Sequence, residues 1–150
     1  MRPFLLHIPK TGGTSLLMNG IRGGHHITYE KGKKYITIIR NPINRTISHF
    51  SEINQKNQNR IDIHFIRKYA DFQTKWLKNK LKVNTLEEIK TILTKDFKVY
   101  ITERLPKEFA HFNTTRRKYL PTLKEKNLIM QENKLDYELY EWVCSFVITN

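Results

Sequence analysis

A lysine, two glycines and several hydroxyl side chains follow one another in the segment PKTGGTS, residues 9–15. Glycines let backbone N–H groups turn toward one point, and a helix that starts directly afterwards adds the positive end of its dipole. A TGG segment by itself is equally compatible with an ordinary turn. Together with the lysine charge and the hydroxyls, it predicts a cradle for a phosphate-like anion. Its members are Lys10, Thr11, Gly12, Gly13, Thr14 and Ser15.

The order of these residues differs from that of the nucleoside triphosphatase loop, G-x-x-x-x-G-K-[ST], in which the lysine follows the glycines. Here Lys10 precedes both glycines, and the nucleoside triphosphatase pattern occurs nowhere else in the chain. The sequence therefore disfavours a Mg²⁺-dependent kinase.

A second segment with anion-binding chemistry is RNPINRTIS, residues 40–48. Arg40 follows a β-branched run, and its guanidinium can donate two parallel hydrogen bonds to a phosphate. Pro42 suits the first turn of a helix, and Ser48 is expected on the side of that helix that faces the site. The segment predicts a second anion site, separate from the first.

The two segments resemble, in the right order, the nucleotide-binding motifs of sulfotransferases that use 3′-phosphoadenosine 5′-phosphosulfate (PAPS). HIPKTGGTSL, residues 7–16, resembles the 5′-phosphosulfate loop, especially that of heparan sulfate 2-O- and 6-O-sulfotransferases. IIRNPINRTISHF, residues 38–50, is similar to the family's 3′-phosphate motif, Arg-[Asp/Asn]-Pro-x-x-Arg-x-x-Ser. ITERLPKEF and LDYELYEW resemble weaker family segments, so the similarity touches both ends of the chain.

The resemblance implies a role for each matching residue. The loop of residues 10–15 would hold the 5′-phosphosulfate, with Lys10 stabilising the leaving group, while Arg40 and Ser48 would bind the 3′-phosphate. Arg45 would contact the nucleotide or brace its helix. In the basic segment 113–122, Arg116 and Arg117 resemble the family's late phosphate-binding loop, although a solvated basic turn is an alternative there. The reaction would need no metal and would yield 3′,5′-adenosine bisphosphate.

The family places a histidine base between its two motifs, and this chain has GGHHITYE in that interval. Histidine titrates near neutrality and can accept a proton from a hydroxyl. HITY resembles the family's HVSY-type segment, which favours His26 as the base and leaves His25 as the alternate. Successive strand residues face opposite sides, so one of the two must point away. His7, within the first motif, is expected to orient the loop.

The chain departs from the family in size, because the animal enzymes are longer and Golgi-anchored. Its 150 residues are expected to form one domain, residues 1–150, with little material for a polymer cleft. The acceptor hydroxyl therefore stays open among a saccharide, a peptide and a small metabolite.

Alternating apolar segments predict the elements that position these residues. Strands are expected at 2–8, 34–40 and 97–102, with an extended piece at 25–29. Helices are expected at 15–21, capped by Thr14 or Ser15 and stopped by Gly23 and Gly24, and then at 43–54, 61–80, 85–95, 104–112 and 132–148. This alternation predicts an α/β, P-loop-like three-layer fold with a small, mainly parallel sheet flanked by helices.

Composition limits the class of partner and the compartment. The 27 Lys and Arg against 14 Asp and Glu give a formal net charge of +13, which favours an anionic partner. The one cysteine, Cys144, lies in an apolar run, which is typical of a buried and inert thiol. No apolar run approaches a transmembrane span and no signal-peptide pattern occurs, so a soluble, cytoplasmic protein is expected.

Three alternatives to an active sulfotransferase remain open at the level of the sequence. One is another nucleotide- or phosphate-binding enzyme, such as a small kinase. The second is a basic nucleic-acid-binding module, although none of the common recognition signatures is present, which makes nucleic acid the weaker expectation. The third is a degenerate relative that binds PAPS without turnover.

Overall fold

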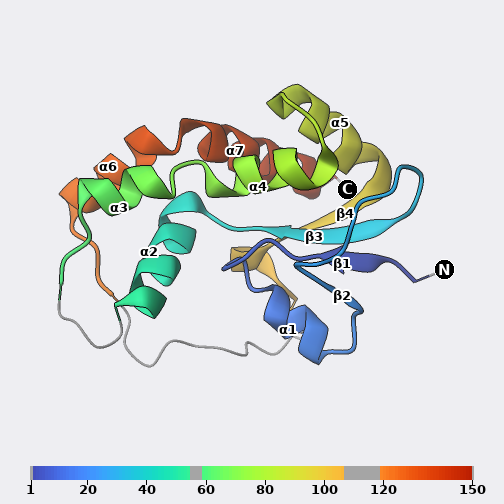
Figure 1. The fold of residues 1–150 in the computed structure, drawn as a ribbon, viewed down its shortest axis with the longest axis horizontal. Helices are drawn as coiled ribbons and strands as arrows, with labels where there is room; N and C mark the ends of the chain where they lie inside the picture. Colours follow the sequence, from blue (N-terminus) through green and yellow to red (C-terminus); the bar gives the residue numbers. More distant parts are fainter. Residues whose placement is uncertain (1, 55–58, 107–118, 150) are drawn as a thin grey trace.

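Residues 2–54, 59–106 and 119–149 are described by a computed structural model (Figure 1). Its centre is a sheet of four parallel strands in the order β2-β1-β3-β4. The strands are β1 (Phe4–Leu6), β2 (Gly23–Gly24), β3 (Tyr35–Ile39) and β4 (Phe97–Ile101). The small, mainly parallel sheet predicted from the sequence is confirmed.

Helices cover both faces of this sheet (Figure 1). On one face α4 (Phe72–Leu81), α5 (Leu86–Asp96) and α7 (Lys134–Thr149) pack over the larger apolar cluster. On the other face, α1 (Gly13–Met18) packs its Leu16 against Leu5, Ile36 and Ile38. Every residue of β3 is buried, as its β-branched run predicts for a strand covered on both sides. The arrangement is consistent with the predicted three-layer α/β fold.

Helix α2 (Pro42–Ile53) starts directly after β3, and two polar groups fix its start. The Asn41 side chain accepts hydrogen bonds from the N–H groups of Ile43 and Asn44, at 2.9 and 3.3 Å. Glu103, from the short 3₁₀ helix η1 (Thr102–Arg104) after β4, accepts a hydrogen bond from Asn41 N at 2.8 Å. The two strand ends are thereby tied to the start of one helix.

The expected helix over 61–80 is two helices, α3 (Ile63–Lys68) and α4. The chain breaks at Asp71, whose φ of 52° lies in the left-handed region. The buried carboxylate of Asp136, on α7, accepts hydrogen bonds from Gln73 N at 3.1 Å and from Thr74 N at 2.8 Å. A distant side chain therefore caps α4, and the prediction of one continuous helix is wrong for this reason.

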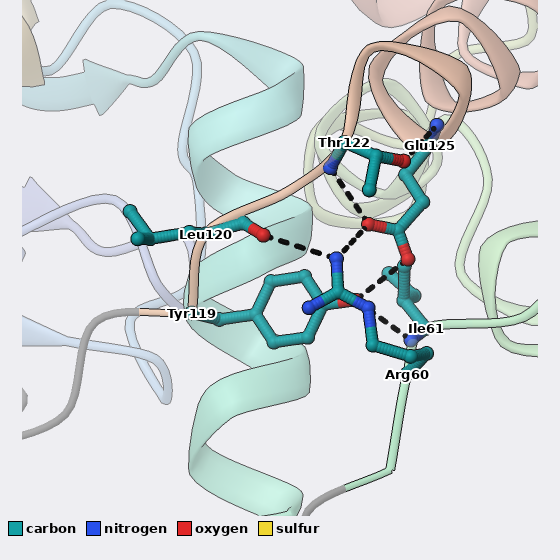
Figure 2. A network of polar contacts seen from close by, with 6 residues as sticks. All are labelled: Arg60, Ile61, Tyr119, Leu120, Thr122 and Glu125. Carbon is teal, nitrogen blue, oxygen red and sulfur yellow. Dashed lines mark hydrogen bonds and ion pairs between the residues drawn. The ribbon is translucent and has the colours of Figure 1, made fainter.

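Helix α6 (Leu123–Glu132) was not predicted, although Thr122 and Glu125 form a capping box at its start. Figure 2 shows that Glu125 also accepts hydrogen bonds from Arg60 and, at 2.7 Å, from the Tyr119 hydroxyl. The same hydroxyl accepts a hydrogen bond from Ile61 N at 3.0 Å. This network joins the segment before α3 to the start of α6.

Two smaller predictions were also wrong. Gly12, not Thr14 or Ser15, is the N-cap of α1, and no side chain caps this helix. The short extended pairing lies at Gly23–Gly24 and not at 25–29. The expected helix at 104–112 falls mostly outside the described residues. Within the described ranges, every helix is too short or too polar to traverse a lipid bilayer.

Candidate functional site

The residues singled out by the sequence gather where the parallel strands end. His7 follows β1, His25 follows β2, Arg40 follows β3, and Thr102 follows β4. The carboxyl edge of a parallel sheet is the usual place for ligands in α/β folds, because loops from neighbouring strands meet there. The candidate site is therefore assembled from four strand ends, three of which the sequence analysis had singled out.

The loop between β1 and α1 is held by the hydroxyl groups of Thr11, which is buried, and Thr102, which is half-buried. Thr11 is fully buried and donates from Oγ1 to the carbonyl of Ile8 at 2.7 Å. The Thr11 carbonyl in turn accepts a hydrogen bond from Thr102 Oγ1. Lys10 and Gly12 both have positive φ, 65° and 91°, so the chain turns sharply on either side of Thr11. These contacts and the two positive φ angles define the shape of the turn.

Gly13 lies directly against the ring of His7. A Cβ at this position would lie 2.2 Å from His7 Cδ2, well inside van der Waals contact. His7 is buried and its ring stacks on that of His25, with centroids 4.2 Å apart. The predicted role of His7, orienting the loop, is thus consistent with its contacts, and a side chain at position 13 would force the His7 ring to shift.

Gly13→Ala is expected to lower the free energy of unfolding by about 1–3 kcal/mol, the usual cost of overpacking. The test is denaturant unfolding of Gly13→Ala alone and combined with His7→Ala, which removes the overlapping ring. The combined loss should fall short of the sum of the two single losses by about 1 kcal/mol. Gly20→Ala is the matched control, because its Cβ would meet nothing within 4 Å and only its φ of 86° is unfavourable. The losses in free energy of unfolding caused by Gly20→Ala and His7→Ala should simply add. If the losses caused by Gly13→Ala and His7→Ala also add, the contact between Gly13 and the His7 ring is contradicted.

Arg40 spans from the end of β3 to the loop. Its Nη1 donates to the carbonyl of Lys10 at 3.2 Å. Its backbone is fixed by the Gln73 amide, which accepts from Arg40 N at 2.9 Å and donates to Arg40 O at 2.8 Å. Burial lowers the pKa of Arg40, and the Glu103 carboxylate opposes that shift. The Nε of this guanidinium is buried and has no hydrogen-bond partner.

Arg45 is buried even more deeply, with 2 % of its surface exposed. Its Nε donates to the carbonyl of Pro9 at 3.3 Å, and its guanidinium lies 3.6 Å from the centre of the Phe72 ring. Burial lowers the pKa of Arg45 to about 10, with Asp136 opposing the shift and Arg40 adding to it. The side chain stays charged at neutral pH, and its Nη2 is buried without a hydrogen-bond partner. Two charged donors thus face the loop with unused hydrogen-bonding capacity.

Ser48 shares a face of α2 with residues that contact the same loop. It lies one turn after Arg45, which bonds to Pro9, and one turn before Glu52, whose carboxylate pairs with the Lys10 ammonium at 2.9 Å. Residues three and four apart lie on the same side of a helix. The predicted anion-site residues Lys10, Arg40 and Ser48 therefore border one region, next to the loop.

The two candidate base residues differ in their contacts. His25 is exposed, and its Nδ1 lies 2.6 Å from the carbonyl of His7. A carbonyl only accepts, so Nδ1 carries the proton and Nε2 of the neutral ring keeps its lone pair. His26 is also exposed, with its ring beside Gly24. Burial and the nearby His25 lower the pKa of His7 to about 4, which keeps that ring neutral. The two rings therefore differ in that the His25 ring is held by a backbone carbonyl and by stacking on His7.

Three contributors to the site were not assigned from the sequence: Gln73, Thr102 and Glu52. Gln73 reaches the site from a distant segment and belongs to no motif, whereas Thr102 lies in the weakly similar segment ITERLPKEF but was given no role from the sequence. The sequence gives a weak indication for Glu52, because it lies seven residues after Arg45 and both therefore lie on the same face of α2. Helix α1 has only six residues, so Lys10, Arg40 and Arg45 supply more of the positive charge than its dipole does. Arg116 and Arg117 lie outside the described residues.

Among the residues that the structure describes, no group of three or more His, Cys, Asp or Glu side chains is arranged to hold a metal ion. Comparison of the chain with protein-family models, curated proteins and solved structures finds no match. The function must therefore be argued from the geometry of the site.

Proposed function

We propose that the protein is a sulfotransferase that moves a sulfuryl group from PAPS to a hydroxyl-bearing acceptor. The proposal joins the sequence resemblance of residues 7–16 and 38–50 to the chemistry of the residues at the carboxyl edge of the sheet.

The observation that carries the proposal is the pair of arginines, Arg40 and Arg45. Each is hydrogen-bonded to a carbonyl of the loop, and each keeps a buried nitrogen without a partner. A buried guanidinium with unmet donors is costly on its own and is stabilised by a bound anion. The turn at Thr11 and the close approach of Gly13 to His7 add a loop of fixed shape beside these cations. This donor set fits a ligand with more than one anionic group, such as a nucleotide that carries several phosphate or sulfate groups.

In the proposed complex, Arg40 and Ser48 hold the 3′-phosphate, while residues 10–15 hold the phosphosulfate. PAPS supplies a sulfuryl group attached to a good leaving group, the 5′-phosphate. Nε2 of His25 accepts the acceptor's hydroxyl proton as the new O–S bond forms. The S–O bond to the 5′-phosphate breaks in the same step, and the Lys10 ammonium stabilises the charge that develops on the departing phosphate oxygen. The identity of the hydroxyl-bearing acceptor stays open, and saccharides are among the candidates.

A ligand-dependent melting experiment tests the nucleotide part of the proposal. At a hundred times its dissociation constant, a ligand stabilises the native state by about 2.7 kcal/mol. For a chain of this size that corresponds to a rise in melting temperature of about 5–10 °C. We expect this rise with 3′,5′-adenosine bisphosphate and a much smaller one with AMP at equal concentration.

Two further ligands separate the proposal from its rivals. ATP with Mg²⁺ should stabilise the protein more than the bisphosphate does if the chain is a small kinase. A DNA oligonucleotide should do so if the net charge of +13 serves nucleic-acid binding. Either outcome would replace the sulfotransferase proposal. Transfer that stops completely in EDTA would also favour the kinase.

A further inference from the structure

The Lys10 ammonium, assigned above to the leaving group, is already paired with a carboxylate. Its Nζ lies 2.9 Å from Oε2 of Glu52, on α2. The Lys10 side chain is 28 % exposed and that of Glu52 is 55 % exposed, so the pair lies at the surface beside the loop rather than in the core. A carboxylate at this position is unexpected beside a site for anions, because it repels them.

The Glu52 carboxylate interacts electrostatically with His49 as well as with Lys10. His49, on the same helix, is close enough that Glu52 raises its pKa, while burial, the largest effect, together with Arg45, Lys10 and Lys68 brings that pKa down to about 4. The His49 ring is therefore neutral and adds no charge of its own. Near the two arginines, the opposing carboxylates are Glu103 and Asp136, and both are engaged by backbone N–H groups. Glu52 is thus the carboxylate paired with the loop lysine itself.

We propose that Glu52 sets the charge of the terminal group that the site accepts, favouring a sulfuryl group over a phosphoryl group. This inference rests on the proposed function, because it takes Lys10 as the residue that meets the end of the phosphosulfate. A sulfuryl terminus carries one negative charge. A terminal phosphoryl group carries about 1.5 to 2 near neutral pH, since its second pKa is about 6.

The physical reason is that Glu52 offsets part of the Lys10 charge. A singly charged terminus still gains from the lysine, whereas the second charge of a phosphoryl group meets the repulsion of the carboxylate. The two termini have almost the same size and tetrahedral shape, so contacts alone distinguish them poorly. Glu52→Gln removes the charge but keeps a side-chain oxygen that can accept a hydrogen bond from Lys10.

The test compares two nucleotides that differ only at the terminus, PAPS and adenosine 3′-phosphate 5′-diphosphate. Their affinities are measured by titration calorimetry at pH 8 and low ionic strength, where screening is weak. The wild-type protein should bind PAPS more tightly. Glu52→Gln should reduce this preference by about three- to tenfold, mainly because the variant binds the diphosphate nucleotide more tightly. The effect is small because the ion pair is exposed to solvent. The matched control is Glu30→Gln, whose carboxylate is 60 % exposed and pairs with Lys33 at 2.6 Å before β3. It should leave the preference unchanged.

Each other outcome counts against the inference. If both nucleotides bind the wild type and Glu52→Gln leaves their ratio unchanged, Glu52 does not select the terminus, and the proposed function stands. If Glu52→Gln weakens both nucleotides equally, Glu52 only places Lys10, and the inference is again overturned. If neither nucleotide binds the wild type, the proposed function fails and the inference fails with it.

Discussion

Replacing His25 with alanine is expected to lower sulfuryl transfer from PAPS by about a hundredfold or more, the usual loss when a general base is removed. His25 is the candidate whose Nδ1 is held by a backbone carbonyl, which leaves Nε2 to take the proton. The measurement is the release of 3′,5′-adenosine bisphosphate in the presence of a panel of hydroxyl-bearing saccharides. Because the side chain is exposed, the melting temperature should change little.

The neighbouring histidine provides the matched control. The sequence favours His26 as the base, whereas the contacts favour His25, and both side chains are exposed. His26→Ala should therefore keep most of the wild-type rate. A large loss in His26→Ala with full activity in His25→Ala would reverse the assignment in favour of the sequence resemblance. Full activity in both variants would place the base elsewhere in the chain.

Arg40→Ala is expected to abolish most of the preference for 3′,5′-adenosine bisphosphate over AMP. A hydrogen bond to a charged group contributes about 1.5–3 kcal/mol, so contacts from Arg40 and Ser48 together correspond to a preference of about a hundredfold or more. Because AMP has no 3′-phosphate, the affinity of Arg40→Ala for AMP should be close to that of the wild type. Titration calorimetry of both nucleotides against the wild type and the variant measures the change.

Two controls accompany the Arg40 experiment. Arg67→Ala removes the same charge from α3, where Arg67 pairs with Glu132 at 3.2 Å, and should leave the preference intact. Ser48→Ala should reduce the preference less than Arg40→Ala does, because a neutral hydroxyl is the weaker donor. If the wild type binds the two nucleotides equally, the 3′-phosphate site does not exist and the PAPS proposal fails.

Local patterns in the sequence were sufficient for β1, β3 and β4 and for helices α1, α2, α5 and α7. Strands β3 and β4 lie within the apolar segments that predicted them, and Thr85, the N-cap of α5, accepts a hydrogen bond from Glu88 N. The capping box at Thr122 and Glu125 was also present in the sequence and could have located α6. These features depend on neighbours along the chain, which a sequence displays directly.

Features that depend on distant residues were not predictable in this way. The break between α3 and α4 is set by Asp136, on α7, and the strand at Gly23–Gly24 forms because those glycines fit against Leu5. A Cβ on Gly23 would lie 2.2 Å from the Leu5 carbonyl oxygen, so the glycines that suggested the end of a helix instead allow two strands to pair. In the site, the ion pair of Glu52 with Lys10 required the packing of α2 against the loop.

The parallel pairing of β3 with β4 also has a consequence for how the chain is made. Helices α2 to α5 lie between these two strands in sequence, although the strands are neighbours in the sheet. Pairings between distant segments form slowly, because a long loop must close first. During synthesis on the ribosome, β3, which is fully buried in the folded chain, is made before its partner β4. The turn at Thr11 lacks its hydrogen bond from Thr102 until that segment emerges. Nascent chains that end before residue 97 are therefore expected to be the stage most prone to aggregation and most dependent on chaperones.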